Sequence, residues 1–272
     1  MTDVPNQLIA RIAADSKYWL WINDQLVIFE GGLKRGPSPS GTYYDPVDIA
    51  PYLTKGTNTI AVLLWHFGKD GFSHINSGKA ALLFEAIAPG LEIVSDASWQ
   101  CALYEAYQNT EAPFPNYRMP ESNIRFDARQ AITNWNRTSF EGSLPGAVCV
   151  GKAGKAPFGE LVERPIPQWK NSGLLSYVSV RESLRGDTLF CRLPYNAQIT
   201  PYLKVEAEAG KTIHIRMDNY EGGSERNVRA EYITREGEQE YESYGWMNGH
   251  EVYYIIPEGV KVLDVKYRET GY

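Results

Sequence analysis

Five residues between positions 35 and 66 carry side chains that proteins use to bind sugars: Arg35, Tyr44, Asp45, Trp65 and His66. An aromatic ring stacks on the apolar face of a sugar, and charged or hydrogen-bonding groups take its hydroxyls. The first three lie in a segment rich in glycine, proline and serine, and the other two end an apolar run beside a glycine-flanked loop. These positions predict a carbohydrate-binding groove at one end of a β-domain.

The same residues also have a purely structural interpretation. Trp21 and Trp65 would then be core aromatics. Asp45 would cap a short helix near Asp48, and Arg35 would pair with a surface carboxylate. The sequence leaves both interpretations open.

Downstream of Arg235, four glutamates alternate with other residues: Glu236, Glu238, Glu240 and Glu242. On an extended strand all four would project from one face, where their repulsion needs solvent, cations or a basic partner. A calcium site or a docking edge for another domain is one interpretation. A solvated hairpin arm that protects a sheet edge is the other.

Catalysis by two carboxyl groups is a further chemistry to weigh, because glycosidases place such a pair about 5–10 Å apart. Asp45 with Asp48, and Asp218 with Glu221, are candidate pairs, but 33 acidic residues produce close pairs by chance. The histidines have no G-x-S-x-G partner, and no phosphate loop or dinucleotide fingerprint occurs. We therefore assign no catalytic residue, and an enzyme in its own right stays a third alternative.

Composition limits the remaining classes. Glycine at 24, proline at 16 and tyrosine at 18 favour a strand-rich, turn-rich fold. The net charge of −6 argues against a nucleic-acid partner, and no apolar run of membrane-spanning length occurs. The first residues do not form a signal peptide, so the compartment stays unknown, with a periplasmic or secreted parent open. The three cysteines show no zinc spacing, and we expect no cofactor and no metal ligands.

Strand signals must position these residues. In the first part of the chain, period-two alternation or short apolar runs predict strands at residues 8–12, 18–22, 25–29, 60–67, 81–87 and 91–94. Asn23-Asp24 is suited to a hairpin turn, and residues 60–67 are expected to form a central strand because they are apolar on both faces. One or two helical turns are expected at residues 47–53 and 127–135.

A loop with several prolines, residues 151–173, marks a change in character. After it, turn residues separate seven further predicted strands, at residues 174–180, 188–193, 202–207, 212–217, 228–234, 251–256 and 262–267. That spacing predicts a second β-sandwich.

Several short motifs occur in an order that resembles the N-terminal β-sandwich region of bacterial α-L-rhamnosidases, glycoside hydrolase family 78. They are YWLWIND (18–24), YYDPVDIAPYL (43–53), KGTNTIAVLLW (55–65), VSDASW (94–99), FDAR (126–129), Trp135, FGEL (158–161), RPIP (164–167) and YIT (232–234).

The resemblance implies an all-β chain of two tandem β-sandwich domains, jelly-roll or galactose-binding-like, at residues 1–160 and 161–272. In that family a helical α/α toroid follows the sandwiches and carries the catalytic acids, so none is transferred to this chain. The resemblance implies a non-catalytic accessory region in bacterial polysaccharide degradation, packed against a catalytic domain missing from this chain. The alternative is a module that binds rhamnose-containing or related plant-type glycans.

Overall fold

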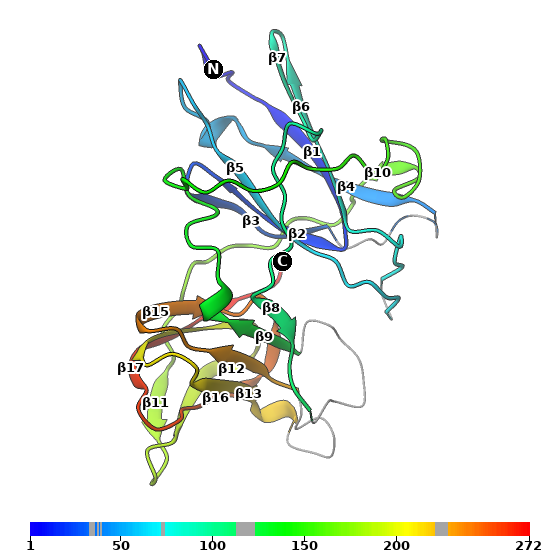
Figure 1. Cartoon of the computed structure of the whole chain (residues 1–272). Helices are drawn as coiled ribbons and strands as arrows, with labels where there is room; N and C mark the ends of the chain where they lie inside the picture. Colours follow the sequence, from blue (N-terminus) through cyan, green and yellow to red (C-terminus); the bar gives the residue numbers. More distant parts are fainter. Residues whose placement is uncertain (33–35, 37, 39, 72–73, 113–122, 221–227) are drawn as a thin grey trace. The chain divides into compact units, whose positions relative to one another are not determined.

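The computed structural model in Figure 1 describes residues 1–272 except 33–35, 37, 39, 72–73, 113–122 and 221–227. Its regular structure is almost entirely β-strand, and its helical segments are single 3-10 turns at η1 (Ala50–Tyr52), η3 (Ala128–Gln130) and η4 (Asp218–Tyr220). The prediction of an all-β fold with few short helices is confirmed. Within the described residues, no helix is long and apolar enough to cross a membrane.

The chain forms two compact units. Unit 1 consists of Met1–Leu103 and Thr133–Trp169, and unit 2 of Tyr104–Ile132 and Lys170–Tyr272. The early segment of unit 2 belongs there because one of its two strands, residues 124–127, pairs with a strand from the C-terminal part of the chain, and its other strand, residues 107–109, pairs with the first. The chain crosses from unit 1 to unit 2 for the last time between Trp169 and Lys170. The domain boundary predicted after residue 160 lies close to that point and stays a prediction.

Unit 1 contains two sheets. The strands of the larger sheet are β1 (Ile9–Asp15), β4 (Thr42–Asp48), β6 (Ala81–Ala88), β7 (Leu91–Val94) and β10 (Leu161–Glu163). Their order is β10-β4-β1-β6-β7, with β10 parallel to β4 and the other pairs antiparallel. The smaller sheet contains β2 (Lys17–Ile22), β3 (Gln25–Gly32) and β5 (Ile60–Trp65), in the order β3-β2-β5.

The hairpin predicted at Asn23-Asp24 joins β2 to β3. Both residues have positive φ, 47° and 69°, which is the conformation of a type I′ turn. The prediction that residues 60–67 form the central strand is wrong, because β2 lies in the middle and β5 pairs with β2 alone among the described strands. Every residue of β2 is buried, so this strand is covered on both faces.

Apolar residues from both sheets form the core of unit 1. Ile12 and Phe84 come from the larger sheet, and Leu20 and Ile22 come from the smaller one. Each of these side chains is at most 2% exposed, so the two sheets are held together by one apolar layer, as in a sandwich.

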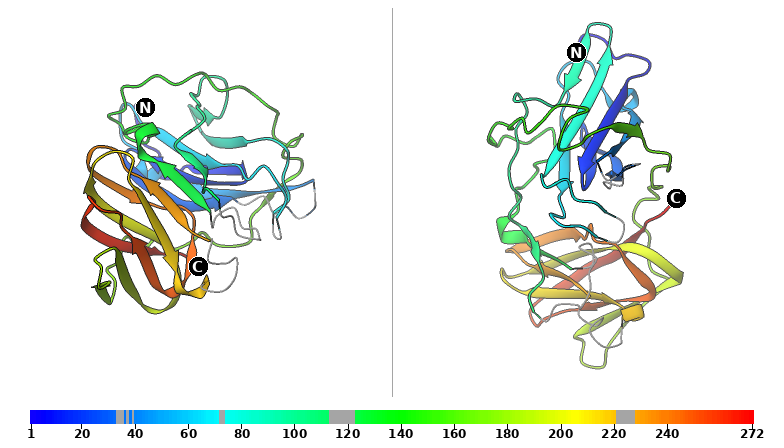
Figure 2. Two further views of the ribbon diagram at one scale, coloured as in Figure 1. Left: turned by 60° about the horizontal axis from the view of Figure 1, so that its bottom comes forward. Right: turned by 90° about the vertical axis from the view of Figure 1, so that its right-hand side faces the viewer.

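Unit 2 is one curled sheet of nine strands (Figure 2). They are β8 (Tyr107–Asn109), β9 (Ile124–Asp127), β11 (Ser179–Glu182), β12 (Thr188–Ala207), β13 (Thr212–Met217), β14 (Ala230–Ile233), β15 (Gly237–Glu242), β16 (Met247–Ile255) and β17 (Lys261–Glu269). The main path runs β11-β12-β16-β13-β14-β9-β8, and β15 and β17 also pair with β12. Its buried core includes Leu203, Ile213, Tyr232 and Tyr254.

Strand β12 replaces two predicted strands, at residues 188–193 and 202–207. It runs unbroken for 20 residues, and its register against β16 shifts between Arg192 and Ala197. Pro194 and Asn196 lie in that irregular stretch and are exposed, so turn-forming residues mark a bulge here instead of a strand end. The first half of β12 pairs with β11 and β16, and the second half pairs with β15 and β17, which lets the sheet curl around its core.

Candidate functional site

Asp45 is the predicted site residue that borders a cavity. The cavity measures about 270 Å³, lies in unit 1, and is lined by Asp45, Pro46 and residues 164–168. Asp45 itself is only 1% exposed, so it lies at the buried base of the cavity and not at its opening. Gln168 Oε1 and Arg164 Nη2 are buried and have no hydrogen-bond partner in the described part of the chain. The cavity therefore offers a free acceptor and a free donor beside a proline-rich wall.

The Asp45 carboxylate is already bound to groups from three other segments. Its Oδ2 accepts hydrogen bonds from the Tyr18 hydroxyl at 2.9 Å and from the Gly32 backbone N–H at 2.8 Å. Its Oδ1 lies 2.6 Å from Nε of Arg164. Burial, together with the negative charge of Asp45, raises the pKa of the Tyr18 hydroxyl well above its ordinary value. Asp45 is thus a structural centre as well as a lining residue.

The other predicted site residues lie elsewhere. Tyr44 is half-buried, with its hydroxyl 3.5 Å from Glu163, and Arg35 lies outside the described residues. The Trp65 ring stacks on Trp19 with centroids 6.3 Å apart, and His66 Nδ1 lies 3.2 Å from the Asp15 carbonyl oxygen. Asp45 therefore borders the cavity, Tyr44 lies beside Glu163, and Trp65 and His66 belong to a second cluster, so a shared sugar groove stays a prediction.

The structural role expected for Asp45 at a helix belongs to a neighbour. Asp48 Oδ1 accepts hydrogen bonds from the backbone N–H groups of Ala50, at the start of η1, and of Leu8. Trp21, which the structural interpretation placed in the core, is 6% exposed and contacts the Trp135 ring edge-on.

A buried ion pair stands inside the second cluster. Lys17 and Glu30 are joined at 2.8 Å, with their side chains 0% and 5% exposed. The ammonium group of Lys17 lies 4.8 Å from the Trp65 ring centroid and 5.3 Å from that of Trp19. Since aromatic faces attract cations, the rings replace part of the hydration that Lys17 loses. Trp65 is therefore engaged with the protein's own cation.

Asp15, Ser16 and His74 form a second polar group that contains the residue types of a hydrolytic triad. Ser16 Oγ donates to Asp15 Oδ1 at 2.9 Å and accepts from the backbone N–H of Phe67 at 3.0 Å. His74 Nε2 lies 3.1 Å from Ser16 Oγ and 3.2 Å from Asp15 Oδ1. The Ser77 backbone N–H donates to the other carboxylate oxygen at 2.6 Å.

This arrangement does not activate a nucleophile. In a triad the histidine separates serine from aspartate, whereas here the Ser16 hydroxyl donates its hydrogen bond to Asp15 directly. All three residues are at most 4% exposed, so a substrate cannot reach Ser16. Burial opposes ionisation of Asp15, but hydrogen bonds from His74, Ser77 and Ser16 lower its pKa to about 2. The hydrogen bonds of Asp15 and Ser16 hold the segment after β5 against the junction of β1 and β2.

The alternating glutamates are paired with partners on neighbouring segments. Glu238 lies 2.7 Å from Lys204, and Glu240 accepts from the Tyr202 hydroxyl at 2.8 Å. The two oxygens of Glu242 accept from Arg268 at 2.7 and 3.0 Å, and Glu236 accepts from the backbone N–H of Ala209 at 3.3 Å. No group of metal-ligating side chains occurs within the described residues.

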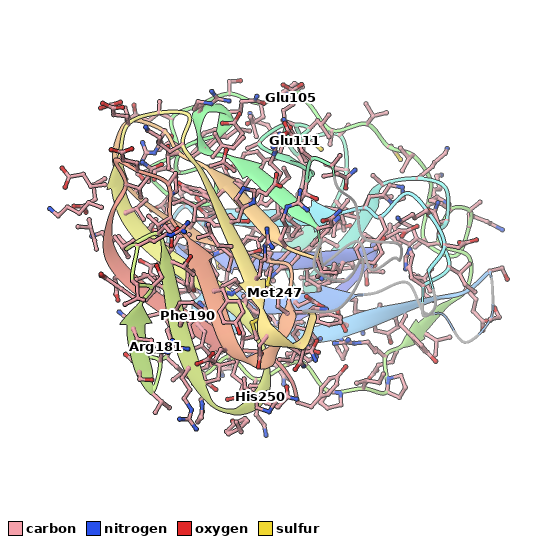
Figure 3. All side chains as sticks on the ribbon, turned by 90° about the horizontal axis from the view of Figure 1, so that it is seen from below. Glu105, Glu111, Arg181, Phe190, Met247 and His250 are labelled. Carbon is pink, nitrogen blue, oxygen red and sulfur yellow. The ribbon has the colours of Figure 1, made fainter. Side chains whose placement is uncertain are left out.

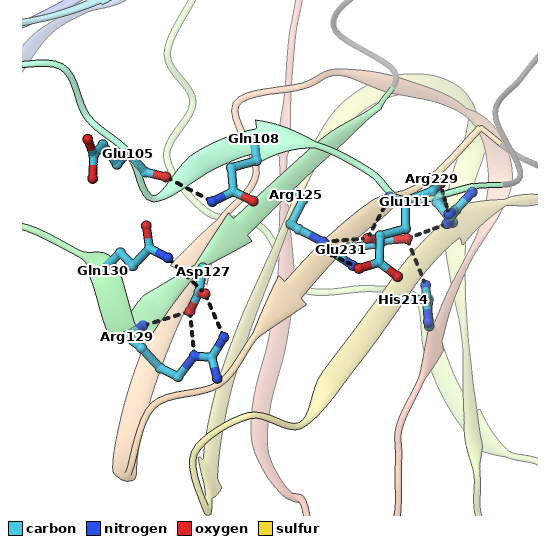
Figure 4. A network of polar contacts seen from close by, with 10 residues as sticks. All are labelled: Glu105, Gln108, Glu111, Arg125, Asp127, Arg129, Gln130, His214, Arg229 and Glu231. Atoms are coloured by element: carbon cyan, nitrogen blue, oxygen red, sulfur yellow. Dashed lines mark hydrogen bonds and ion pairs between the residues drawn. The ribbon is translucent and has the colours of Figure 1, made fainter.

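A network of charged and polar side chains in unit 2 lies at positions where the sequence predicted no site (Figure 4). It borders a cavity of about 240 Å³ lined by Glu111, Ala112, Arg125, Thr212, His214, Arg216, Arg229 and Glu231. Glu231 is 1% exposed, and it accepts from Arg229 Nε at 2.7 Å and from Arg125 Nε at 2.9 Å. Arg125 also reaches Glu111 at 2.7 Å, which lowers the pKa of that carboxyl.

The sequence contains one signal for the network around Glu231, which is the alternation of polar and apolar residues along β13. Thr212, His214 and Arg216 alternate with apolar residues that enter the core, so the three polar side chains share the opposite face of β13. Arg125 and Glu231 lie on β9 and β14, which only the sheet pairing brings beside β13. The alternation was visible, but its partners were not.

Neighbouring polar contacts of unit 2 are structural. Asp127 accepts from the backbone N–H of Arg129 at the start of η3 and from the Arg129 guanidinium at 2.9 and 2.8 Å. The guanidinium carbon of Arg181 lies 4.3 Å from the Phe190 ring centroid, a contact between the side chains labelled in Figure 3. Cys191 is buried and its thiol pKa is raised to about 12 by burial and Glu251, while Cys101 and Cys149 are exposed free thiols.

Comparison with known proteins identifies solved structures that share this fold. No protein-family model and no curated protein sequence matches the chain. Among solved structures, a GH78 family rhamnosidase of Bacillus sp. GL1 aligns with a TM-score of 0.81 and 15% identity, over 100% of this chain and 52% of that chain. The chain has the fold of part of an α-L-rhamnosidase.

Two further structures support that assignment of the fold. The α-L-rhamnosidase of Dictyoglumus thermophilum aligns with a TM-score of 0.70 and 19% identity, over 99% of this chain and 31% of that one. The Streptomyces avermitilis α-L-rhamnosidase complexed with L-rhamnose aligns with 0.66 and 18%, over 97% and 27%. The chain thus spans between about a quarter and a half of the length of these rhamnosidases. The resemblance expected from its motifs is matched at the level of the fold over 97–100% of this chain.

The Asp15 group predicts a specific loss of stability in acid. Because the folded pKa of about 2 lies below the ordinary value of 3.8, ionised Asp15 stabilises the fold above pH 4. That contribution, about 2 kcal/mol, disappears as the pH falls from about 4 to 2. Urea unfolding at pH 7, 4 and 2.5 measures it. The Asp15→Asn variant should lose less stability over this interval than the native chain, and equal losses would contradict the assignment.

The buried pair predicts strong coupling between Lys17 and Glu30. Lys17→Met or Glu30→Gln alone leaves a buried charge without its partner and should cost about 3–5 kcal/mol. The double variant removes both charges and should cost clearly less than the sum. Urea unfolding of the four proteins at pH 7 gives the coupling energy. Additive losses would show that the pair contributes little.

Proposed function

We propose that this chain is a non-catalytic accessory region of a larger α-L-rhamnosidase-like glycoside hydrolase, where it packs against a catalytic domain. The observation that carries the proposal is a fold match that takes in the whole chain but about half of the Bacillus rhamnosidase. The remainder of such a protein would supply the hydrolytic acids. The jelly-roll or galactose-binding-like topology expected from the sequence belongs to this proposal.

The carboxylates bordering the two cavities support a non-catalytic role. A glycosidase needs one carboxyl group with a raised pKa as its proton donor. Asp45 and Glu231 instead bind guanidinium groups, and Arg125 lowers the pKa of Glu111. Neighbours that stabilise the ionised form oppose the role of general acid.

An apolar edge of unit 2 suits the proposed packing. Strand β11 pairs with β12 alone among the described strands, and Val178 and Val180 are 63% and 49% exposed. Val178 immediately precedes β11 and Val180 lies within it, so both exposed apolar side chains lie at this edge. An exposed sheet edge with apolar side chains is a surface that another domain covers in a complete protein.

The proposal predicts that hydrolysis requires chain beyond this region. A chromogenic α-L-rhamnoside should give no turnover with residues 1–272 alone and measurable turnover with the full reading frame of the gene. The reading frame should encode a helical domain of several hundred residues. Turnover by this chain alone, or a frame without such a domain, would overturn the proposal.

Substitution of the edge sharpens that experiment. In the full-length protein, Val178→Lys with Val180→Lys should lower the midpoint of thermal inactivation, because two charges would enter the domain contact. Leu184→Lys is the matched control, since that side chain is 108% exposed. An identical midpoint in both variants would remove β11 from the contact while leaving the turnover test unaffected.

A second candidate function, carbohydrate binding, is favoured by the Asp45 cavity. Its unpartnered Gln168 oxygen and Arg164 nitrogen match the donors and acceptors of sugar hydroxyls. Its wall of prolines provides the apolar side. The ligand would be a rhamnose-containing or related plant-type glycan.

Calorimetry with L-rhamnose and plant-type oligosaccharides tests this candidate. We expect a dissociation constant of millimolar or tighter, equivalent to at least about 4 kcal/mol. Gln168→Ala should weaken binding, while Gln25→Ala, an exposed glutamine on β3, should not. Absence of heat with every sugar would eliminate the candidate.

A further inference from the structure

The cavity of unit 2 is built on the outer face of three adjacent strands. In the register, His214 of β13 faces Glu231 of β14, and Glu231 faces Arg125 of β9. Arg229 and Arg216 lie one pleat further along the same face. The opposite face, with Ile213 and Ile215, enters the core. The sheet therefore presents an ordered array of charged groups to one cavity, with Arg229 and Glu231 buried and Arg125, His214 and Arg216 half-buried.

Charges around this cavity do not balance. Three guanidinium groups, those of Arg125, Arg216 and Arg229, border it with two carboxylates, Glu111 and Glu231. Both carboxylates are already bound to Arg125, and Glu231 also to Arg229. His214 adds little positive charge near neutral pH, because burial lowers its pKa. Among the described residues that line the cavity, one cationic charge is left over.

That surplus charge belongs to Arg216. No ion pair joins it to a carboxylate among the residues the structure describes, and its Nε is buried without a hydrogen-bond partner. Burial and the nearby Arg229 charge lower the pKa of Arg216, yet a guanidinium stays protonated at any physiological pH. Nδ1 of His214, on the same face, lies 3.7 Å from Glu231 Oε1, beyond hydrogen-bond distance, and is buried without a hydrogen-bond partner.

We propose that this cavity binds the carboxylate group of a small acid through Arg216, with His214 as a second polar contact. A planar carboxylate accepts two parallel hydrogen bonds from a guanidinium, and its single negative charge cancels the surplus. The volume of about 240 Å³ lies below the roughly 300–1,000 Å³ of drug-sized ligand sites, which limits the ligand to a small acid or to one acidic sugar residue.

The charge balance argues against other ligand classes. A phosphate dianion would carry more charge than the single cation left over. A metal cation would meet three guanidinium groups at close range. A long polyanion such as nucleic acid needs an exposed basic surface, whereas Arg229 is 4% exposed and the chain carries a net charge of −6.

Thermal unfolding and calorimetry with defined anions test the proposal at constant ionic strength. Sodium glucuronate and sodium acetate are the probes, and glucose, sodium phosphate and sodium chloride are the comparisons. We expect saturable binding of glucuronate and a ligand-dependent rise of the melting temperature. Equal binding of acetate would identify a free carboxylic acid as sufficient, and binding of glucuronate alone would identify a uronic acid residue. Either pattern supports a carboxylate site.

Arg216→Gln should weaken glucuronate binding at least tenfold, and Arg216→Lys should weaken it because lysine lacks the planar fork. Arg192→Gln is the matched control, since this exposed arginine of β12 changes the net charge equally. We expect the ligand-free Arg216→Gln chain to be at least as stable as the native one, because it no longer holds a half-buried charge that has no anionic partner among the described residues.

Three outcomes would overturn the proposal. They are binding of phosphate or chloride as tight as that of glucuronate, no saturable binding of either carboxylate, and binding that survives Arg216→Gln. The experiment does not use rhamnoside turnover, so its failure leaves the accessory role standing, and failure of the accessory role leaves the carboxylate site standing.

Discussion

Unit 1 depends on a buried carboxylate that must be supplied with donors from distant segments. Asp45 belongs to the larger sheet, while Tyr18 and Gly32, which donate to it, belong to the smaller sheet. Arg164, just after β10, adds the opposite charge. An unpaired carboxylate in this position would cost several kcal/mol, so these four segments are constrained together. The constraint also explains Gly31, where a Cβ atom would lie 2.3 Å from the Tyr18 ring. By holding Arg164, it brings residues 164–168 beside Asp45 and thereby creates the cavity.

Unit 2 meets the same constraint with a different result. Glu231 is as deeply buried as Asp45 and is bound by Arg125 and Arg229. Two bound arginines would suffice for it and Glu111, yet Arg216 stands beside them without an anionic partner in the described part of the chain. A burial cost without internal compensation is expected at positions retained for a ligand. This difference separates the two cavities, because that of unit 1 has its charges paired and that of unit 2 does not.

Local patterns predicted the strands, and tertiary pairing decided what those patterns could not. Alternation located β1, β2 and β13, and Asn23-Asp24 located the β2–β3 hairpin, because side-chain direction and turn geometry are local properties. The apolar run at residues 60–67 suggested a central strand, but it pairs on one side only, which depends on sheet order. Asp45 was found by residue type, whereas its partner Arg164 is remote in sequence. The Arg216 group combines residues from β13 and β14 with residues from an early segment, a combination that no single stretch of sequence contains.

The groups left without partners also bear on the kind of function that this chain can perform. Hydrolysis of a glycoside requires one carboxyl group that can release a proton and another that can either attack the sugar or activate a water molecule. The carboxylates at both cavities are instead bound by arginines, and Arg125 lowers the pKa of Glu111, which opposes a role for that group as proton donor. Among the described residues lining the cavities, the polar atoms without a hydrogen-bond partner include Gln168 Oε1, Arg164 Nη2, Arg216 Nε and His214 Nδ1, the last of which lies 3.7 Å from Glu231 Oε1. Such groups can orient a ligand through hydrogen bonds and charge. In the described residues that line the cavities, they are hydrogen-bonding and charged groups and not the acid–nucleophile pair of a glycosidase.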